Sequence, residues 1–169
     1  MSPVKRWFGR DRPAADPRPL PPPADVAGLR HSLNELIRRV NASAGRLPAG
    51  AVVDIRDMGD RLGQLLDHED RMGGPGAGAE TYEMITLASV IRDYLPTSVE
   101  AYLALPPEFL ASHRNPEGET PAEELRSQLS IMEKGVTELA QAIYSGDAQR
   151  LSIQGRFLDA KFSSSDLDL

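Results

Sequence analysis

The strongest constraint on the fold is the apolar periodicity between Thr120 and Gly146. Apolar residues recur there at steps of four, three, four, three and four: Leu125, Leu129, Met132, Val136, Leu139 and Ile143. At 3.6 residues per turn, these side chains share one face of an α-helix. Thr120, Pro121 and Glu123 form a capping box with a proline in the first turn, which predicts where the helix begins. Gly146 stands where a helix often ends.

The same spacing recurs in other segments of the chain. It predicts helices from Asp25, a typical N-cap residue, to about residue 44, from Ala49 to Arg71, and from Glu80 to Leu95. A last helix is expected from Asp147 to Phe162. Residues expected to face inward in the third helix are Met84, Ile85, Leu87, Ala88, Ile91 and Leu95. No segment shows the alternation of a strand, so we predict an all-α bundle of four or five longer helices with one break at Pro96.

Pro96 lies within a stretch that reads as helix on both sides. A proline in a helix interior costs about 3 kcal/mol, whereas one in the first turn is tolerated. The sequence therefore predicts either one helix that kinks at Pro96 or two helices, the second with Pro96 in its first turn. We expect the hydroxyls of Thr97 and Ser98 to cap the new N-terminus, with Tyr94 and Tyr102 flanking the joint. The main interpretation is a structural corner, and the alternative is a ligand or partner notch beside the break.

Residues 1–23 have a different composition from the rest of the chain. They carry five basic and two acidic residues, recurring prolines and no apolar periodicity, which predicts a disordered tail and polyproline spacer. A cluster of basic and apolar residues suits an anionic membrane interface or a docking motif for a protein groove. The candidate binding residues in it are Val4, Lys5, Arg6, Trp7, Phe8 and Arg10. The expected division of the chain is this tail, a helical domain at 24–162, and a disordered acidic C-terminus at 163–169.

The remainder of the chain, 24–169, has fourteen basic and twenty-three acidic residues, a net charge of -9. An acidic body argues against nucleic-acid binding, which needs a basic face. The chain has no cysteine, no apolar run long enough to span a membrane and no secretory signal. We therefore expect a cytoplasmic protein, with peripheral membrane binding through residues 1–12 as the alternative. Lysine is rare beside arginine, which favours a GC-rich bacterial genome.

Catalytic and metal-binding patterns are weak throughout. His31, His68 and His113 are scattered, and the sequence around His68 does not match a zinc-protease helix. The carboxylates of Asp54, Asp57 and Asp60 lie on one face of a predicted helix, and we interpret this face as exposed to solvent. No phosphate-binding loop or nucleophile motif is present. We therefore predict no cofactor, no metal and no enzymatic activity, with a phosphate-ester hydrolase as the least favoured reading.

The stretch "YLPTSVEAYLALP" resembles a segment of the bacterial XpaC-like family, which is discussed alongside the TelA toxic-anion resistance proteins. The matching residues are Tyr94, Leu95, Pro96, Thr97, Ser98, Tyr102 and Leu103. A looser similarity lies in "DAQRLSIQGRFLDAKF", so the resemblance spans residues 80–162, about half of the chain. The sequence departs from the family at Arg92, Asp93, Glu100 and Ala101. The resemblance implies a toxic-anion (tellurite) or stress-response context and brings no catalytic residues.

These observations favour a non-enzymatic helical interaction or adaptor protein. It would bind a protein partner through the basic aromatic tail or through a groove near Pro96. Regular helical stripes also permit self-association.

Overall fold

A computed structural model describes residues 25–72 and 81–165, with side chains as far as Arg156. It confirms the all-α fold, since every regular element in this part of the chain is helical. The elements are α2 (Val26–Ala42), α3 (Ala49–Met72), α4 (Tyr82–Ser89), the π-helical turn η1 (Val90–Tyr94), α5 (Leu95–Leu103), α6 (Pro107–Ser112) and α7 (Pro121–Ser165).

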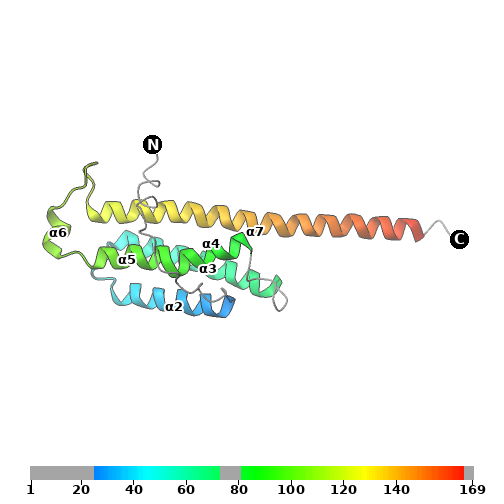
Figure 1. Cartoon of the computed structure of the whole chain (residues 1–169), viewed down its shortest axis with the longest axis horizontal. Helices are drawn as coiled ribbons and strands as arrows, with labels where there is room; N and C mark the ends of the chain where they lie inside the picture. Colours follow the sequence, from blue (N-terminus) through cyan, green and yellow to red (C-terminus); the bar gives the residue numbers. More distant parts are fainter. Residues whose placement is uncertain (1–24, 73–80, 166–169) are drawn as a thin grey trace, which may run out of the picture.

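The helices form a bundle around one apolar core. In Figure 1, α2, α3 and the run from α4 to α5 lie beside the first half of α7, while α6 lies at one end of the bundle. The large side chains that are at most 1% exposed come from five of the helices and from the π turn. They are Leu29, Leu36, Ile55, Met58, Leu62, Leu65, Leu66, Met84, Leu87, Ile91, Leu95 and Leu129. The apolar stripes predicted for α2, α3 and the first part of α7 supply most of this core.

Two of the predicted helix starts are confirmed by their capping hydrogen bonds. The carboxylate of Asp25 accepts from the amide of Gly28 at 2.5 Å. At the start of α7, the amide of Thr120 donates to Glu123 Oε2 at 2.8 Å, and the amide of Glu123 donates to Thr120 Oγ1 at 3.1 Å. These reciprocal bonds satisfy two backbone donors that the first helical turn leaves without a partner.

The chain passes Pro96 through a change of helix type. The amide of Leu95 reaches back five residues to the carbonyl of Val90, which makes η1 a widened π turn. α5 then begins at Leu95 with Pro96 in its first turn, as the second of the two alternatives predicts. A proline ring clashes with the carbonyl four residues earlier in a regular α-helix, and a π turn is one way to relieve this crowding. No residue between Tyr82 and Leu103 leaves the helical conformation.

The prediction that Gly146 ends a helix is wrong. α7 runs without interruption from Pro121 to Ser165, so the separate helix expected from Asp147 does not exist. A glycine that ends a helix usually adopts a positive φ, and among the described residues only Gly118 does so. An interior glycine costs about 1 kcal/mol relative to alanine, which does not outweigh well-formed helix on both sides. The prediction that Ile85 faces the core is also wrong, because this residue is 56% exposed.

The predicted tail, residues 1–23, lies outside the described residues. α7 ends at Ser165, within the segment 163–169 that the sequence predicts as a disordered C-terminus. Residues 166–169 lie outside the described part.

Candidate functional site

A shallow apolar groove lies between the end of α2 and α5, directly beside Pro96. We call it the Pro96 groove, and its volume is about 160 Å³. Its lining residues are Leu36, Arg39, Ala42, Ser43, Pro96, Val99, Glu100 and Leu103. This shallow hollow lies beside Pro96, where the alternative interpretation of the sequence expects a ligand or partner notch.

Charged side chains lie at the rim of this groove. Arg39 Nη1 and Glu100 Oε1 form an ion pair at 2.6 Å, and both side chains are more than half exposed. Exposed pairs of this kind contribute about 0–1 kcal/mol, so the pair mainly defines the edge of the groove. Arg46 donates to the carbonyl of Leu103 at 2.6 Å, which satisfies an acceptor at the C-terminal end of α5. A second hollow adjoins on the other side of Leu103 and is lined in part by Tyr102 and Leu110.

The structure separates the four residues of the predicted Pro96 motif. Pro96 lines the Pro96 groove, and Tyr102 lines the second hollow. Tyr94 and Thr97 are exposed.

The expected hydroxyl caps are wrong, because no side chain caps the start of α5. Ser98 is 3% exposed, and its Oγ has no hydrogen-bond partner among the described residues. The η1 turn before α5 is itself helical, so the backbone amides at the start of α5 already face carbonyl groups of η1.

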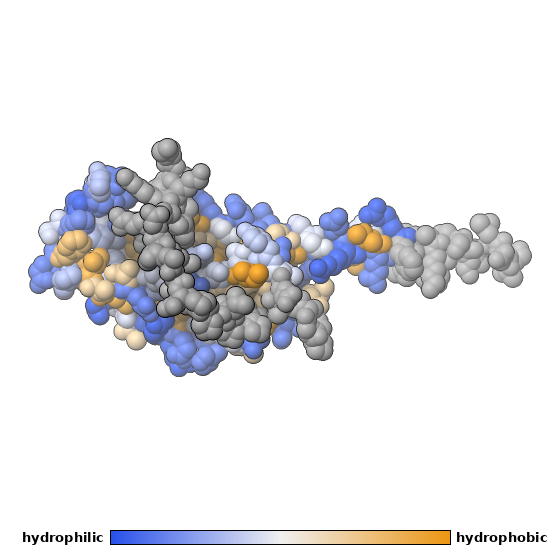
Figure 2. Space-filling model, viewed as in Figure 1, coloured by the Kyte–Doolittle hydropathy of each residue, from blue (hydrophilic) through white to orange (hydrophobic). Residues whose placement is uncertain are grey.

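The second half of α7 extends beyond the bundle (Figure 1). On the part of α7 whose side chains are described, Ile143 is the last buried residue, and every residue from Ala148 to Arg156 is exposed. Figure 2 shows apolar residues among hydrophilic ones on this projecting part. They include Leu151, 72% exposed, and Ile153, 54% exposed. We call residues 148–165 the α7 tip.

Exposed apolar side chains concentrate where α7 leaves the bundle. Of the ten large apolar side chains exposed in the described residues, six lie on the end of α3, the first turn of α4 and residues 144–153 of α7. These six are Met72, Tyr82, Ile85, Tyr144, Leu151 and Ile153. Single exposed apolar residues are ordinary, so these six mark this end of the bundle only as a candidate binding surface.

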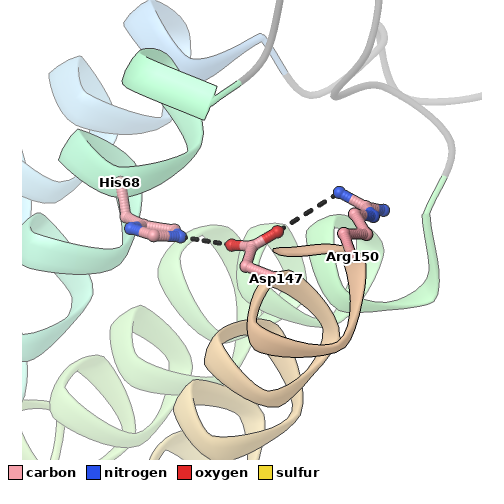
Figure 3. A network of polar contacts seen from close by, with 3 residues as sticks. All are labelled: His68, Asp147 and Arg150. Atoms are coloured by element: carbon pink, nitrogen blue, oxygen red, sulfur yellow. Dashed lines mark hydrogen bonds and ion pairs between the residues drawn. The ribbon is translucent and has the colours of Figure 1, made fainter. Parts of the chain in front are cut away.

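A polar network ties α7 to α3 at the same place (Figure 3). His68 Nε2 lies 2.5 Å from Asp147 Oδ2, and Arg150 Nη1 donates to the other carboxylate oxygen at 3.2 Å. The rings of Tyr144 and His68 are nearly perpendicular, with 5.0 Å between the ring centroids. The His68 and Asp147 side chains are 20% and 18% exposed, so water screens this contact less than it screens the other ion pairs. Among the described residues, this is the last hydrogen bond between α7 and the bundle before the α7 tip.

Negative charge collects around this network. Partial burial and the nearby carboxylate of Asp147 raise the pKa of Glu69, and His68 and Arg150 offset this only in part. Glu83, on α4, adds to the repulsion. The carboxylates of Glu69, Asp147 and Glu83 therefore lie close enough to repel one another at the base of the α7 tip.

Sequence reasoning did not find this cluster. His68 and Asp147 are 79 residues apart, and the interpretation of the histidines as scattered rests on local sequence alone. The acidic, histidine-containing end of α3 is a signal of unusual charge, but no local pattern pairs it with α7. The candidate tail residues, from Val4 to Arg10, lie outside the described residues.

Comparisons with known proteins give no match. No family model, curated protein or solved structure is similar to this chain at a significant level. Among the described residues, no helix combines the length and the apolar character needed to cross a membrane. The same part of the chain contains no group of three or more histidine and carboxylate side chains placed to hold a metal ion.

Proposed function

We propose that this chain is a helical interaction protein that binds another protein surface through the α7 tip. One observation supports the proposal above the others: α7 continues to Ser165, although its described residues after Asp147 are all exposed. In proteins, most helical stability comes from the packing of an apolar face rather than from intrinsic helix propensity. A partner surface would supply that packing.

The chemistry of the tip defines what would fit it. Leu151 and Ile153 present aliphatic side chains, and between Ala148 and Arg156 the charged residues are Arg150 and Arg156. A complementary surface is therefore apolar with carboxylates at its edge. Asp147 and His68 would hold the base of the helix against α3 while the tip engages its partner.

Affinity capture with the full-length chain tests this proposal. We expect Leu151→Asp with Ile153→Asp to lose the captured protein, because two charges would be placed in the contact. Val53→Asp is the matched control, since Val53 on α3 is also 54% exposed and lies away from the tip. Equal capture by all three proteins would refute binding through the tip.

The Pro96 groove is a second candidate binding place, because its apolar lining includes Pro96 itself. It has room for an aliphatic side chain of a partner helix. Ala42→Gln would fill the groove from its exposed edge, and Ala101→Gln on the exposed side of α5 is the control. Loss of a captured protein on Ala42→Gln alone would support the groove, and retention would exclude it.

The sequence resemblance adds a proposed setting. Tyr94, Pro96 and Thr97 resemble the XpaC-like segment, and on this basis we place the binding role in bacterial toxic-anion resistance or stress response. The basic aromatic tail is a further proposed docking element, for a protein or an anionic membrane. We propose a non-enzymatic role throughout.

A further inference from the structure

The outer side of α4 is an apolar surface that no described element covers. Tyr82 is 78% exposed and Ile85 56%, and the two lie three positions apart, so they are neighbours on one face of the helix. Met72, the last residue of α3, is 59% exposed. Figure 1 shows the end of α3 and the start of α4 at the same end of the bundle. We call these three residues the α3–α4 face.

Carboxylates border this face. Glu69 and Asp70 belong to the last turn of α3, and Glu83 belongs to the first turn of α4. None of the ion pairs between described residues includes any of the three. The cation in the last turn of α3 is Arg71, so carboxylates outnumber cations at the border of the face.

The environment of Glu69 agrees with this excess of negative charge. Burial raises the pKa of Glu69, and the carboxylates of Asp147 and Glu83 raise it further. His68 and Arg150 act in the opposite direction, but both already contact Asp147, and the pKa stays above its ordinary value. A further cation beside Glu69 would therefore be stabilising.

The chain itself contains a segment of matching chemistry. Residues 4–10 carry three apolar side chains, three basic ones and no carboxylate. They include Val4, Lys5, Arg6, Trp7, Phe8 and Arg10. Such a segment would cover apolar side chains and place cations beside the carboxylates that border them.

The described chain begins close to the α3–α4 face. Arg30, near the start of α2, pairs with Asp67 near the end of α3 at 2.6 Å, so Asp25 lies at the same end of the bundle as the face. Residues 11–24 join Asp25 to the basic aromatic segment, and fourteen extended residues reach about 43 Å at 3.1 Å per residue. The connection is therefore long enough for the segment to reach the face.

Charge disfavours the other apolar surfaces for this segment. The charged residues that line the Pro96 groove and the hollow beside it are Arg39, Arg46 and Glu100, in which cations are in excess. This groove also lies at the far end of α2, about 26 Å along the helix axis. The described part of the α7 tip carries Arg150 and Arg156 and no carboxylate.

We propose that residues 4–10 dock on the α3–α4 face of their own chain, with Trp7 and Phe8 against its apolar side chains and the basic residues beside its carboxylates. Because the segment is attached to the bundle, its effective concentration is on the order of 1 mM, and a weak contact is enough to hold it. The inference goes beyond the proposed function, since it does not involve the α7 tip. A membrane or protein that binds the segment would have to compete with the α3–α4 face.

Trp7 provides the test, because it is the single tryptophan of the chain. We expect Trp7 in the full-length protein to be shielded from acrylamide quenching. Tyr82→Ser with Ile85→Ser should increase the quenching and shift the emission to longer wavelength, because the apolar contact is lost. Val53→Ser is the matched control, since Val53 is also an exposed apolar residue and lies on another part of α3.

Thermal melting of the same variants separates undocking of the segment from unfolding of the bundle. All three positions are exposed, so we expect little change in Tm. A wild-type Trp7 that is as accessible as in the Tyr82→Ser, Ile85→Ser variant would overturn the proposal. Equal shielding of Trp7 in that variant and in the wild type would overturn it as well.

A charge exchange tests the contact with the carboxylates. Arg6→Glu and Glu83→Arg should each expose Trp7, and the two together should restore part of the shielding. Glu108→Arg is the control, because Glu108 is exposed on α6 at the opposite end of the bundle. The shielding should also fall as salt rises, because exposed charges are screened. No recovery in the double variant would exclude the pairing of the segment with this border.

Dilution and lipid vesicles distinguish the face from other occupants of the segment. Shielding of Trp7 that does not change with protein concentration supports docking within one chain, whereas shielding that is lost on dilution assigns the contact to a second copy. If Trp7 is accessible in the protein alone and becomes shielded only with phosphatidylserine vesicles, the segment binds membranes and the proposal is overturned. None of these outcomes changes the expected capture through the α7 tip, so the two proposals fail separately.

Discussion

Replacement of Ser98 by alanine should stabilise the protein. Ser98 is 3% exposed, and its hydroxyl has no hydrogen-bond partner in the described structure. Burial of an unpaired hydroxyl costs about 1–3 kcal/mol in proteins, and alanine favours helix over serine by about 0.5 kcal/mol. The lost contacts of the oxygen atom offset part of this gain. We expect Ser98→Ala to raise the free energy of unfolding by about 1 kcal/mol.

Chemical denaturation and thermal melting measure this change. A gain of about 1 kcal/mol corresponds to a rise of about 2–4 °C in Tm for a chain of this size. Thr97→Ala is the control, because Thr97 is exposed on the same turn and gains helix propensity alone. If Ser98→Ala instead lowers the stability by 1 kcal/mol or more, the hydroxyl has a partner and the reasoning is wrong.

Three further predictions concern the helix start and the network at the base of α7. Thr120→Ala should lower the free energy of unfolding by about 1 kcal/mol, because it removes one of the two hydrogen bonds of the capping box. Chemical denaturation measures this change, and an unchanged midpoint of the unfolding transition would contradict the prediction. Asp147→Ala should lower the free energy of unfolding by about 1 kcal/mol, because it removes the contact of α7 with His68. Amide hydrogen exchange should become faster after Ile143 than in α2, and an equal change in both segments would contradict this prediction. The raised pKa of Glu69 means that the wild-type protein loses stability as the pH rises through that pKa, so Glu69→Gln should have the higher Tm at pH 7. The difference in Tm between Glu69→Gln and the wild type should disappear below pH 4.5, the ordinary pKa of a glutamate. A difference in Tm that stays constant with pH would show that the charge of Glu69 is not its cause.

The helical content of this chain follows from local sequence. Asp25 and the pair Thr120 and Glu123 mark helix starts with their own side chains, and the structure confirms both. The stripe of α7 from Leu125 to Ile143 also faces the core, as its spacing predicts. Capping and periodicity depend on residues within four positions of one another, so the sequence by itself determined them.

Helix ends and partners depend on contacts that local sequence does not contain. Gly146 is a good terminator on local grounds, but it stays helical within α7. Ile85 fits the inward stripe of its helix, yet it is exposed because none of the described elements covers that side of α4.

The candidate surfaces were decided by the tertiary structure alone. The contact between His68 and Asp147 joins residues 79 positions apart, and the Pro96 groove needs α2 beside α5. Periodicity shows which side of each helix is apolar, but it does not show where the neighbouring helices end. Because the other helices stop short of the end of α7, the apolar stripe of this continuous helix is buried as far as Ile143, and the residues from Ala148 to Arg156 are exposed. The sequence by itself determined the helices and their apolar faces, and the tertiary structure decided which of those faces stay uncovered.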